Sequence, residues 1–377
     1  ISGATGAQNS TLNAGDEVTI SVNMSESVQV SGTPTLALNI GGQIVNASYV
    51  SGSNSSSLVF KYTIVDGQND LNGISISSGN ISLNGGTMID VAANAAVLAH
   101  GAVADNSSYM VDTVAPTKTI SGLALSADTG SSGSDFITNT AAQTITATLS
   151  GSLATGEKLY GSLDNGASWS DISSKVSGTA VSWDGVTLSG SSTILMEVRD
   201  AAGNAGTAKS QAYVLDTTAP TKPTITSVGG SDSTVSAQSS DNTIVGTADA
   251  NSVVTIKSGL NTLGTTTADG SGNFTYTLTS SNLTTLGQGN ISLTASQSDV
   301  AGNTGTSSSY SASVDTVGPS KTIGSLALSA DTGSSGSDFI TSTAAQTISA
   351  TSSSALGTDK LYGSLDNGAT WSDISSK

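Results

Sequence analysis

A chain of 377 residues is longer than one ordinary domain, and its complete lack of cysteine excludes a scaffold stapled by disulfides. Only 4% of its residues are aromatic and 10% are charged, and the charge is one-sided, with a net value of −17. An acidic surface without a basic patch repels phosphate backbones, so this composition excludes nucleic-acid binding.

Short runs of Val, Ile, Leu and Thr, separated by Gly, Asn, Asp and Ser, predict antiparallel strands along the chain. In chain order, strands are expected at residues 17–24, 35–40, 57–65, 81–86, 142–150, 158–163, 192–200, 208–216, 242–248, 252–259, 272–279 and 290–299. No window shows a sustained helical period. The Ala-rich stretch 91–104 is too short to span a bilayer, so no membrane insertion is expected. The expected fold class is all-β, with modest cores.

An internal repeat is the strongest signal in the sequence. The stretch KTISGLALSADTGSSGSDFIT from Lys118 returns almost unchanged from Lys321, and KLYGSLDNGASWSDISSK from Lys158 returns from Lys360. Linkers that end in proline (VDTVAP, LDTTAP and VDTVGP) divide the chain into stretches of the size of an immunoglobulin-like sandwich. The predicted domains are 1–113, 114–217, 218–316 and a partial domain, 317–377, which is a truncated repeat of the second.

Three motif types carry a family resemblance: SADTGSSGSDFIT in the second and fourth domains, VGTADANSVVTI with DVAGNTG in the third, and MSESVQVSGTPTLALNIGG in the first. With these motifs, the chain resembles the tandem bacterial immunoglobulin-like repeats of giant surface adhesins, including RTX adhesins and their biofilm-associated relatives. The resemblance implies tandem Ig-like β-sandwich domains arranged as an elongated rod. It also implies a secreted stalk, an extender, that holds a distal ligand-binding module away from the bacterial cell surface.

Aspartates recur at fixed places beside the linkers. Asp200 in DAAGN stands sixteen residues ahead of Asp216 in LDTTAP, and Asp299 in DVAGN stands sixteen ahead of Asp315 in VDTVGP. About ten extended residues, at roughly 3.3 Å each, separate the members of a pair, so they lie near opposite poles of one domain. They cannot share an ion. Each DxAGN aspartate is instead expected to face the linker aspartate of the preceding domain.

Calcium is predicted to bind at these joints, because the chain has 24 Asp but only 4 Glu and no disulfides. Asp200 would face Asp112, and Asp299 would face Asp216, each across a joint, with backbone carbonyls and water completing the shell. The predicted joint ligands are Glu26, Asp90, Asp112, Asp200, Asp216, Asp249, Asp299 and Asp315.

A second set of candidate calcium ligands brackets the Gly/Ser loop of SADTGSSGSDFIT: Asp128 and Asp135, repeated as Asp331 and Asp338. The loop either holds an ion or is a turn stabilised by its own Asp side chains, and the sequence leaves both readings open.

Asp, Asn and Gly also make turns without metal, and this reading applies to every single aspartate above. The Asn residues of the DxAGN motif, Asn94, Asn204 and Asn303, are expected to cap their turns rather than bind metal.

No catalytic constellation emerges. SLDNGASW at residues 162–169 fits the Asp box of sialidase-like propellers, which is a hairpin motif, but the chain has one Arg where a sialidase needs several. The chain has a single His and no Cys, so a catalytic triad has only one candidate for its base, and no residue is seen that would orient it. The sequence therefore predicts that the chain is not an enzyme.

The function that follows is a structural extender, rigidified by calcium at its linkers, which supports cell adhesion or biofilm formation. Its partners would be neighbouring Ig-like domains of the same chain, with self-association possible through the incomplete fourth domain. Two alternatives stay open: a module that binds a glycan or a protein, and a subunit of a self-assembling surface filament or S-layer.

Overall fold

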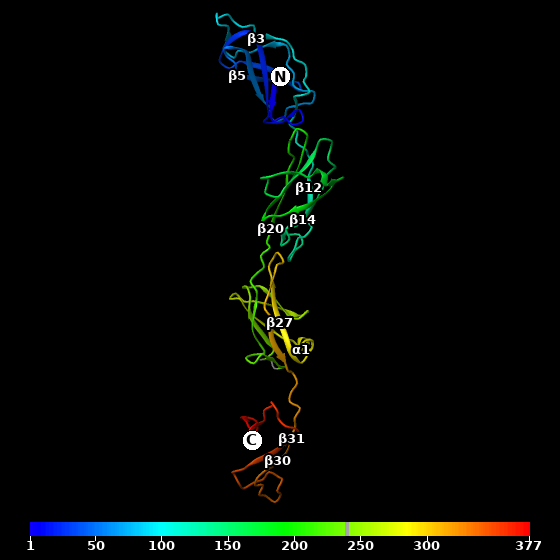
Figure 1. Ribbon diagram of the computed structural model, residues 1–377, viewed down its shortest axis with the longest axis vertical. Helices are drawn as coiled ribbons and strands as arrows, with labels where there is room; N and C mark the ends of the chain where they lie inside the picture. Colours follow the sequence, from blue (N-terminus) through cyan, green and yellow to red (C-terminus); the bar gives the residue numbers. More distant parts are fainter. Residues whose placement is uncertain (238–240) are drawn as a thin grey trace. The chain divides into compact units, whose positions relative to one another are not determined.

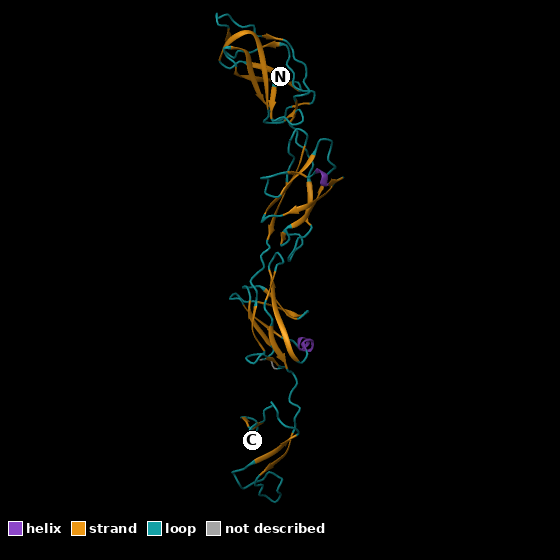
Figure 2. Ribbon diagram, viewed as in Figure 1, coloured by secondary structure: helices purple, strands orange, loops and turns teal. Residues whose placement is uncertain are grey.

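The structure, a computed structural model, describes residues 1–237 and 241–377 as strands joined by loops, with little helix (Figure 2). The chain forms two compact units, one of Ile1–Thr221 with Gln297–Gly305 and the other of Lys222–Ser296 with Thr306–Lys377. The first unit therefore contains the loop 297–305 from the third predicted domain. Every sheet lies within one of the four predicted stretches, which are called the first to fourth domains below (Figure 1).

The first domain contains a sheet with the strand order β1-β3-β6-β5-β4, in which β9 also pairs with β3, and a smaller sheet, β2-β11-β7. Its strands are β1 (Gly3–Thr5), β2 (Thr11–Leu12), β3 (Glu17–Ser31), β4 (Thr35–Ile40), β5 (Gln43–Ser51), β6 (Ser55–Thr63), β7 (Asn69–Asp70), β8 (Gly79–Asn80), β9 (Thr87–Ile89), β10 (Ala99–His100) and β11 (Met110–Asp112). Alternate residues of β4, Leu36, Leu38 and Ile40, are buried against Phe60 because successive side chains point to opposite faces.

The second domain pairs a four-stranded sheet, β12-β14-β18-β17, with a five-stranded one, β13-β20-β19-β15-β16. Its elements are β12 (Ile120–Leu125), β13 (Ile137–Thr138), β14 (Ala142–Leu149), β15 (Lys158–Ser162), β16 (Ser170–Asp171), the 3-10 turn η1 (Ser173–Lys175), β17 (Val176–Ser177), β18 (Ala180–Thr187), β19 (Ser192–Arg199) and β20 (Lys209–Leu215). Gly161 lies under the Trp183 ring, where an added Cβ would be 2.6 Å from the ring, so this strand position requires glycine.

The third domain has sheets β21-β23-β26 and β22-β29-β27-β24-β25, with β28 paired to β27. Its elements are β21 (Thr224–Val228), β22 (Thr234–Val235), β23 (Thr243–Thr247), β24 (Val253–Ser258), β25 (Asn261–Thr267), β26 (Asn273–Thr277), α1 (Ser280–Leu286), β27 (Gly289–Ser298), β28 (Thr304–Thr306) and β29 (Tyr310–Val314). Periodicity does not predict α1, because seven residues are too few to show a period. A capping box between Thr279 and Asn282 starts it, and Gly287 ends it.

The fourth domain contains two antiparallel strand pairs, β30 (Ile323–Leu328) with β31 (Ile348–Ser352) and β32 (Tyr362–Gly363) with β33 (Ser372–Asp373). Residues 317–377 repeat the sequence of β12 to β16 of the second domain, and the structure forms counterparts of β12, β14, β15 and β16 there but none of β13 or of β18 to β20. Apolar residues of the fourth domain are therefore exposed, whereas β18 to β20 cover their counterparts in the second domain. Ile348 is 46% exposed, whereas its counterpart Ile145 is fully buried.

A parallel edge pair recurs in three domains: β2 with β11, β13 with β20, and β22 with β29. The other described pairs of these sheets are antiparallel, so in each of the three domains the second strand, and not the first, joins the sheet of the last strand, as in an Ig-like sandwich. The predicted fold class, all-β with tandem Ig-like sandwich domains, is confirmed. The strand expected at 81–86 is reduced to a single bridge of Ser82 to Thr35.

Candidate functional site at the domain joints

Each DxAGN loop is closed by its own aspartate. Asp200 Oδ1 accepts the backbone N–H groups of Ala202 and Asn204, both at 2.9 Å, and Oδ2 accepts the Asn204 side-chain amide at 2.8 Å. Asp299 binds Asn303 in the same way, at 2.9 Å and 2.8 Å. The asparagines therefore cap their turns as predicted, and the carboxylates that were expected to bind metal already accept several hydrogen bonds.

The corresponding loop of the first domain has the same closure. Asp90 accepts the Ala92 and Asn94 N–H groups at 2.8 Å and the Asn94 amide at 2.7 Å. These bonds, led by the one from the Asn94 side chain, hold the pKa of Asp90 below its usual value. Asp90 also lines one hollow together with Glu26 and His100, so the structure brings the predicted pair Glu26 and Asp90 to the same surface.

The capping asparagine also reaches across the joint. The second hydrogen of the Asn204 amide is donated to the backbone carbonyl of Asp112 at 2.9 Å. Asn303 makes the equivalent bond to the carbonyl of Asp216 at 2.8 Å. All of these residues belong to the first compact unit. The facing pairs are thus Asp200 with Asp112 and Asp299 with Asp216, connected through an asparagine amide and a backbone carbonyl.

A second set of contacts at the first joint comes from the residues on either side of β2. Asn13 Nδ2 donates to the carbonyl of Ala202 at 2.9 Å, and Asn9 Nδ2 donates to the carbonyl of Ala201 at 2.8 Å. Ala202 is only 2% exposed. The DAAGN loop therefore lies between the linker and the pole of the preceding domain.

The second joint has the same arrangement with a different donor. Thr129 Oγ1 donates to the carbonyl of Ala301 at 2.6 Å, and Ala301 has no exposed surface. The backbones of Gly130 and Gly302 touch, since an added Cβ on Gly302 would lie 2.9 Å from the Gly130 nitrogen. Sequence reasoning missed Asn13, which lies in no linker and no repeated motif, and it missed Thr129 because only the aspartates of the SADTGSSGSDFIT repeat were considered.

Close backbone approach at the linkers completes both joints. A Cβ on Gly206 would lie 2.6 Å from the carbonyl oxygen of Pro116, and a Cβ on Gly305 would lie 2.6 Å from that of Pro220. The residue two positions after Asn204 and after Asn303 is therefore a glycine, because the linker passes directly over it.

The linker aspartates hold their own turns. Asp112, Asp216 and Asp315 each accept, through Oδ1, the backbone N–H two residues further on, at 2.9, 2.9 and 3.1 Å. Asp249, expected to join a metal site, lies in the turn before β24, where its carbonyl accepts the Ser252 N–H at 3.1 Å. These are the roles of aspartate in turns without metal.

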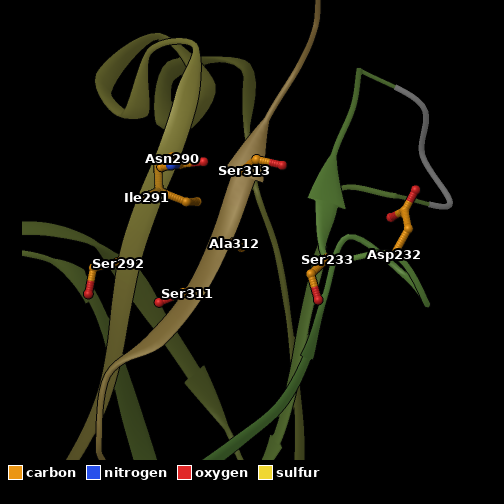
Figure 3. Close-up of a pocket in the computed structure, with 8 residues that line it drawn as sticks. All are labelled: Asp232, Ser233, Asn290, Ile291, Ser292, Ser311, Ala312 and Ser313. Carbon is orange, nitrogen blue, oxygen red and sulfur yellow. The ribbon is translucent and has the colours of Figure 1, made fainter. Parts of the chain in front are cut away.

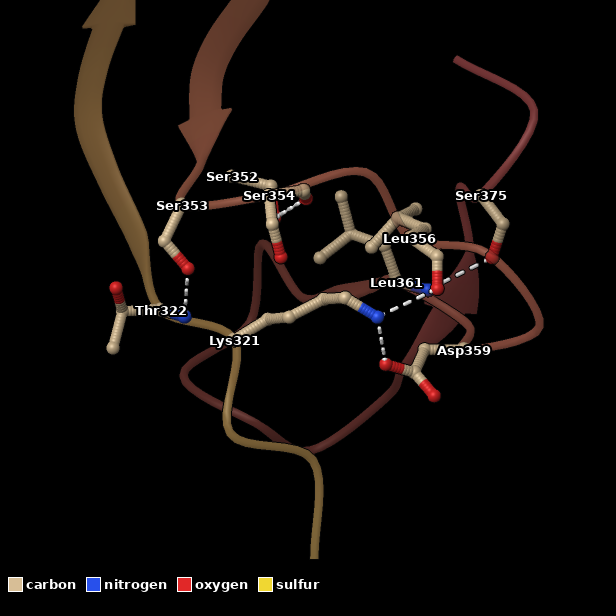
Figure 4. Close-up of polar contacts among 9 residues, drawn as sticks. All are labelled: Lys321, Thr322, Ser352, Ser353, Ser354, Leu356, Asp359, Leu361 and Ser375. Atoms are coloured by element: carbon tan, nitrogen blue, oxygen red, sulfur yellow. Dashed lines mark hydrogen bonds and ion pairs between the residues drawn. The ribbon is translucent and has the colours of Figure 1, made fainter.

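A lysine that follows the linker neutralises the nearby acidic loop. Lys118 forms an ion pair with Glu157 at 2.5 Å, with both side chains mostly buried. Burial raises the pKa of Glu157, but the bonds from Lys118 and the Ala154 N–H outweigh it and lower the pKa overall. In the fourth domain Lys321 pairs with Asp359 and donates to the Leu356 carbonyl at 2.7 Å (Figure 4).

The Gly/Ser loops differ from the joints in one respect. Asp128 Oδ2 accepts the Phe136 N–H at 3.0 Å, but Asp128 Oδ1 is buried without a hydrogen-bond partner. The repeat copy shows the same orphan oxygen at Asp331. Asp135 and Asp338 each accept the N–H two residues further on, at 3.0 and 3.1 Å. A buried carboxylate oxygen without a donor is unusual and marks a place for an ion or a water molecule.

The described residues do not assemble a full calcium shell. Within residues 1–237 and 241–377, no group of three His, Cys, Asp or Glu residues lies close enough to hold a metal. Calcium takes six to eight oxygens, so carbonyls and water would have to supply most of them. The joint carboxylates offer the poorer fit and the orphan oxygens of Asp128 and Asp331 the better one. Metal binding by the predicted residues stays a prediction.

The Asp box of the second domain is a hairpin with a structural aspartate. Asp164 accepts the Ser168 N–H at 2.8 Å, the Ser168 hydroxyl at 2.5 Å and the Ser162 hydroxyl at 2.7 Å. These bonds, with the Ser168 side chain first, lower the pKa of Asp164 to about 2. These three hydrogen bonds of the carboxylate all come from its own turn.

Arg199, the one arginine of the chain, is also committed to packing. Its guanidinium pairs with Glu197 at 2.7 Å and lies over the rings of Tyr160 and Trp169, 4.5 Å and 5.0 Å from their centroids. This arrangement stabilises the hairpin through cation–π contacts and leaves no free arginine for a substrate carboxylate.

A shallow pocket on the third domain is lined by residues of β27, β29 and the turn before β22, which are small and polar except for Ile291 and Ala312 (Figure 3). None of the described residues that line it is aromatic. It therefore lacks the ring platform on which sugars usually stack. In the part of the chain that the structure describes, no helix has the length and apolar character needed to cross a membrane.

Comparison with known proteins gives one family match. A model of a bacterial Ig-like domain matches residues 218–316, the range predicted for the third domain. No curated protein matches the chain.

Several solved structures overlap with the chain at low similarity. A structure of a 1.5-MDa bacterial ice-binding adhesin shares 18% identity, covers 82% of this chain and 95% of its own, and has a TM-score of 0.29. A Ca²⁺-stabilized adhesin of an Antarctic bacterium shares 20% identity, with 87% and 77% covered and a TM-score of 0.31. A tetra-tandem repeat from the extending region of a large adhesion protein shares 20%, with 85% and 76% covered and a TM-score of 0.22. These whole-chain superpositions are poor, and the family model matches residues 218–316 of the chain.

Proposed function

We propose that this chain, whose residues 218–316 belong to the bacterial Ig-like domain family, is an extender segment of a bacterial cell-surface adhesin. One observation carries the proposal: the same asparagine-to-carbonyl bond recurs at two successive joints, Asn204 to Asp112 and Asn303 to Asp216. A chain of independent modules has no need for such a repeated contact. A stalk, in contrast, needs a repeated contact of this kind to keep successive domains aligned.

The physical benefit of fixed joints is that the chain keeps a larger mean end-to-end distance. A flexible tether of the same length explores many compact conformations, so its ends are on average close together. Each joint that fixes its linker through hydrogen bonds and close backbone contacts removes part of that freedom. Reach then grows in proportion to the number of domains, and the role is mechanical, with no enzymatic step.

The proposal also includes calcium binding by this chain. The orphan oxygens of Asp128 and Asp331 support binding at the Gly/Ser loops. Calcium at the joints has less support, because Asp200 and Asp299 accept hydrogen bonds from their own loops. The proposal therefore assigns rigidity at the joints to direct contacts, with calcium as an additional ligand of the loops.

Small-angle scattering of the whole chain tests the extender role. The double variant Asn204→Ala, Asn303→Ala removes both joint bonds, and Asn94→Ala is the matched control, since Asn94 caps an identical turn without bonding to a linker in the described residues. We expect a shorter mean dimension and a broader conformational ensemble for the double variant, and a profile like that of the unmodified chain for the control. Identical profiles for all three proteins would refute the proposed role of the joints.

A second candidate, self-association, is favoured by the bare apolar residues of the fourth domain. Ile340, Leu326 and Trp371 are 66%, 56% and 63% exposed. Sedimentation of the whole chain at increasing concentration tests it: a second copy covering this face gives a mass that rises to a dimer, and a constant monomer mass removes the candidate.

A further inference from the structure

The Gly/Ser loop occurs twice with one sequence, SADTGSSGSDFIT, beginning at Ser126 and at Ser329. Its internal hydrogen bonds agree in the two copies. The hydroxyls of Thr129 and Thr332 each accept the backbone N–H ten residues further on, at 2.8 Å in both cases. The loop is therefore held in place by its own domain before any neighbour is considered.

One backbone angle differs between the copies. Gly130 has a φ of +95° and lies against the loop of the third domain, where a Cβ would be 2.0 Å from the Val300 carbonyl oxygen. Its counterpart Gly333 does not adopt a positive φ, and the nearest atom to an added Cβ is the Ile340 oxygen at 3.3 Å. The left-handed conformation, which favours glycine, thus occurs in the copy that has a neighbour against it.

The contact with the neighbour is specific in its chemistry. Thr129 Oγ1 donates to the carbonyl of Ala301, a residue with no exposed surface, at 2.6 Å. Gly302 follows, with a φ of +89° and so little space that a Cβ would approach the Gly130 nitrogen to 2.9 Å. No carboxylate takes part in these contacts.

We propose that the Gly/Ser loop of the second domain is a docking socket for the Ala-Gly turn of a neighbouring Ig-like domain, and that Thr129 and Gly130 select that neighbour without metal. The partner is a domain whose loop reads Asp-x-Ala-Gly-Asn. This deepens the proposed function, on which it rests, by naming the residues that decide which domain follows which.

The chain itself contains a loop that this socket would reject. The first domain carries DVAAN, in which Ala93 stands at the position of Gly302 and adopts a φ of 67°. An alanine there is compatible with the turn, but its methyl group would press on the Gly130 backbone of the socket. Selection thus depends on a single methyl group at the contact.

Spin-label distances test the proposal. The chain has no cysteine, so the exposed Ser182 and Ser292, each replaced by cysteine, carry labels on the second and third domains. Thr129→Val removes the bond to Ala301 and the hydroxyl's bonds within its own loop, whereas the matched control Thr332→Val removes only the bonds within the loop of the other copy. We expect the population of open joints to rise about fivefold for Thr129→Val, the factor for one lost hydrogen bond, and to stay unchanged for Thr332→Val.

A second variant keeps the test decisive if Thr129→Val disturbs its domain. Gly302→Ala converts the loop to the DVAAN form, whose turn folds in the first domain, and should also open the joint. All distances are measured in EGTA and again in calcium. Distance distributions unchanged by Thr129→Val and Gly302→Ala, or opened by EGTA alone, overturn the socket. An effect of Asn303→Ala without an effect of Thr129→Val also overturns it, while leaving the extender role in place.

Discussion

The side-chain amide of Asn303 donates a hydrogen bond to the backbone carbonyl of Asp216, 87 residues earlier in the chain, at 2.8 Å. The other hydrogen of the same amide is bound to Asp299 Oδ2 at 2.8 Å. One side chain therefore closes its own turn and holds the preceding linker. Asn204 repeats both bonds at the first joint, which makes the asparagine the most informative residue of the motif.

Replacing Asn303 by Asp should loosen the second joint more than replacing it by Ala. The carboxylate cannot donate to the Asp216 carbonyl, and it also places a like charge against Asp299. Backbone NMR relaxation measures this loosening, because a loosened joint gives the second and third domains separate rotational correlation times. Asn94→Asp, in the corresponding turn of the first domain, should leave those two times coupled; if it separates them equally, the joint bond is not the cause.

The Asp box should make the second domain sensitive to acid. The pKa of Asp164 is lowered from 3.8 to about 2, so folding favours its ionised form. The stability it contributes is complete above pH 3.8 and is lost as the pH falls through about 2. Thermal unfolding followed by tryptophan fluorescence between pH 5 and pH 2 measures this, at roughly unit pH steps. Asp164→Asn should give a shallower decline, and an equally steep decline would assign the effect to other groups.

Gly161→Ala should destabilise the second domain by about 1–3 kcal/mol, because the new methyl group overlaps the buried Trp183 ring. The matched substitution Gly363→Ala meets only the tip of Ile374, at 3.0 Å, and should cost less. Calorimetry of the whole chain distinguishes them, since the transition of the second domain moves only for Gly161→Ala. Equal shifts would mean that the ring contact does not limit this position.

Calcium binding should depend on the orphan oxygens of the Gly/Ser loops. Asp128→Asn and Asp331→Asn keep the size of each side chain but remove its charge, so each should abolish binding at its own loop. Titration calorimetry should show a loss of one site for each single variant and of both for the double variant. Asp135 and Asp338 accept local N–H bonds. Binding that survives the double variant would place calcium elsewhere.

Much of the fold follows from the alternation of apolar residues. The stretch 35–40 is a strand because Leu36, Leu38 and Ile40 share one face, and the structure buries all three. The stretch 81–86 shows the limit of this pattern. It has similar composition, but Asn84 and Gly85 take positive φ values of 47° and 80° and turn the chain away from the sheet.

The candidate site was predictable only in part. The spacing of Asp200 and Asp216, with the length of the strand between them, predicts which domain each faces. It gives no indication of Asn13 or Thr129, which lie 189 and 172 residues from the carbonyls they bind. Each donor is a single polar residue in a loop, and its role depends on the tertiary arrangement rather than on any local pattern.

The central claim is that direct contacts hold the joints, and scattering of the unmodified chain with and without EGTA tests it most directly. The asparagine-to-carbonyl bonds require no metal, so the account predicts that the maximum dimension and the flexibility of the chain stay the same when calcium is removed. The Asn204→Ala, Asn303→Ala variant, measured beside it, should be more flexible in both buffers. A chain that loosens in EGTA and is unaffected by the two substitutions would contradict the account and point to calcium as the brace.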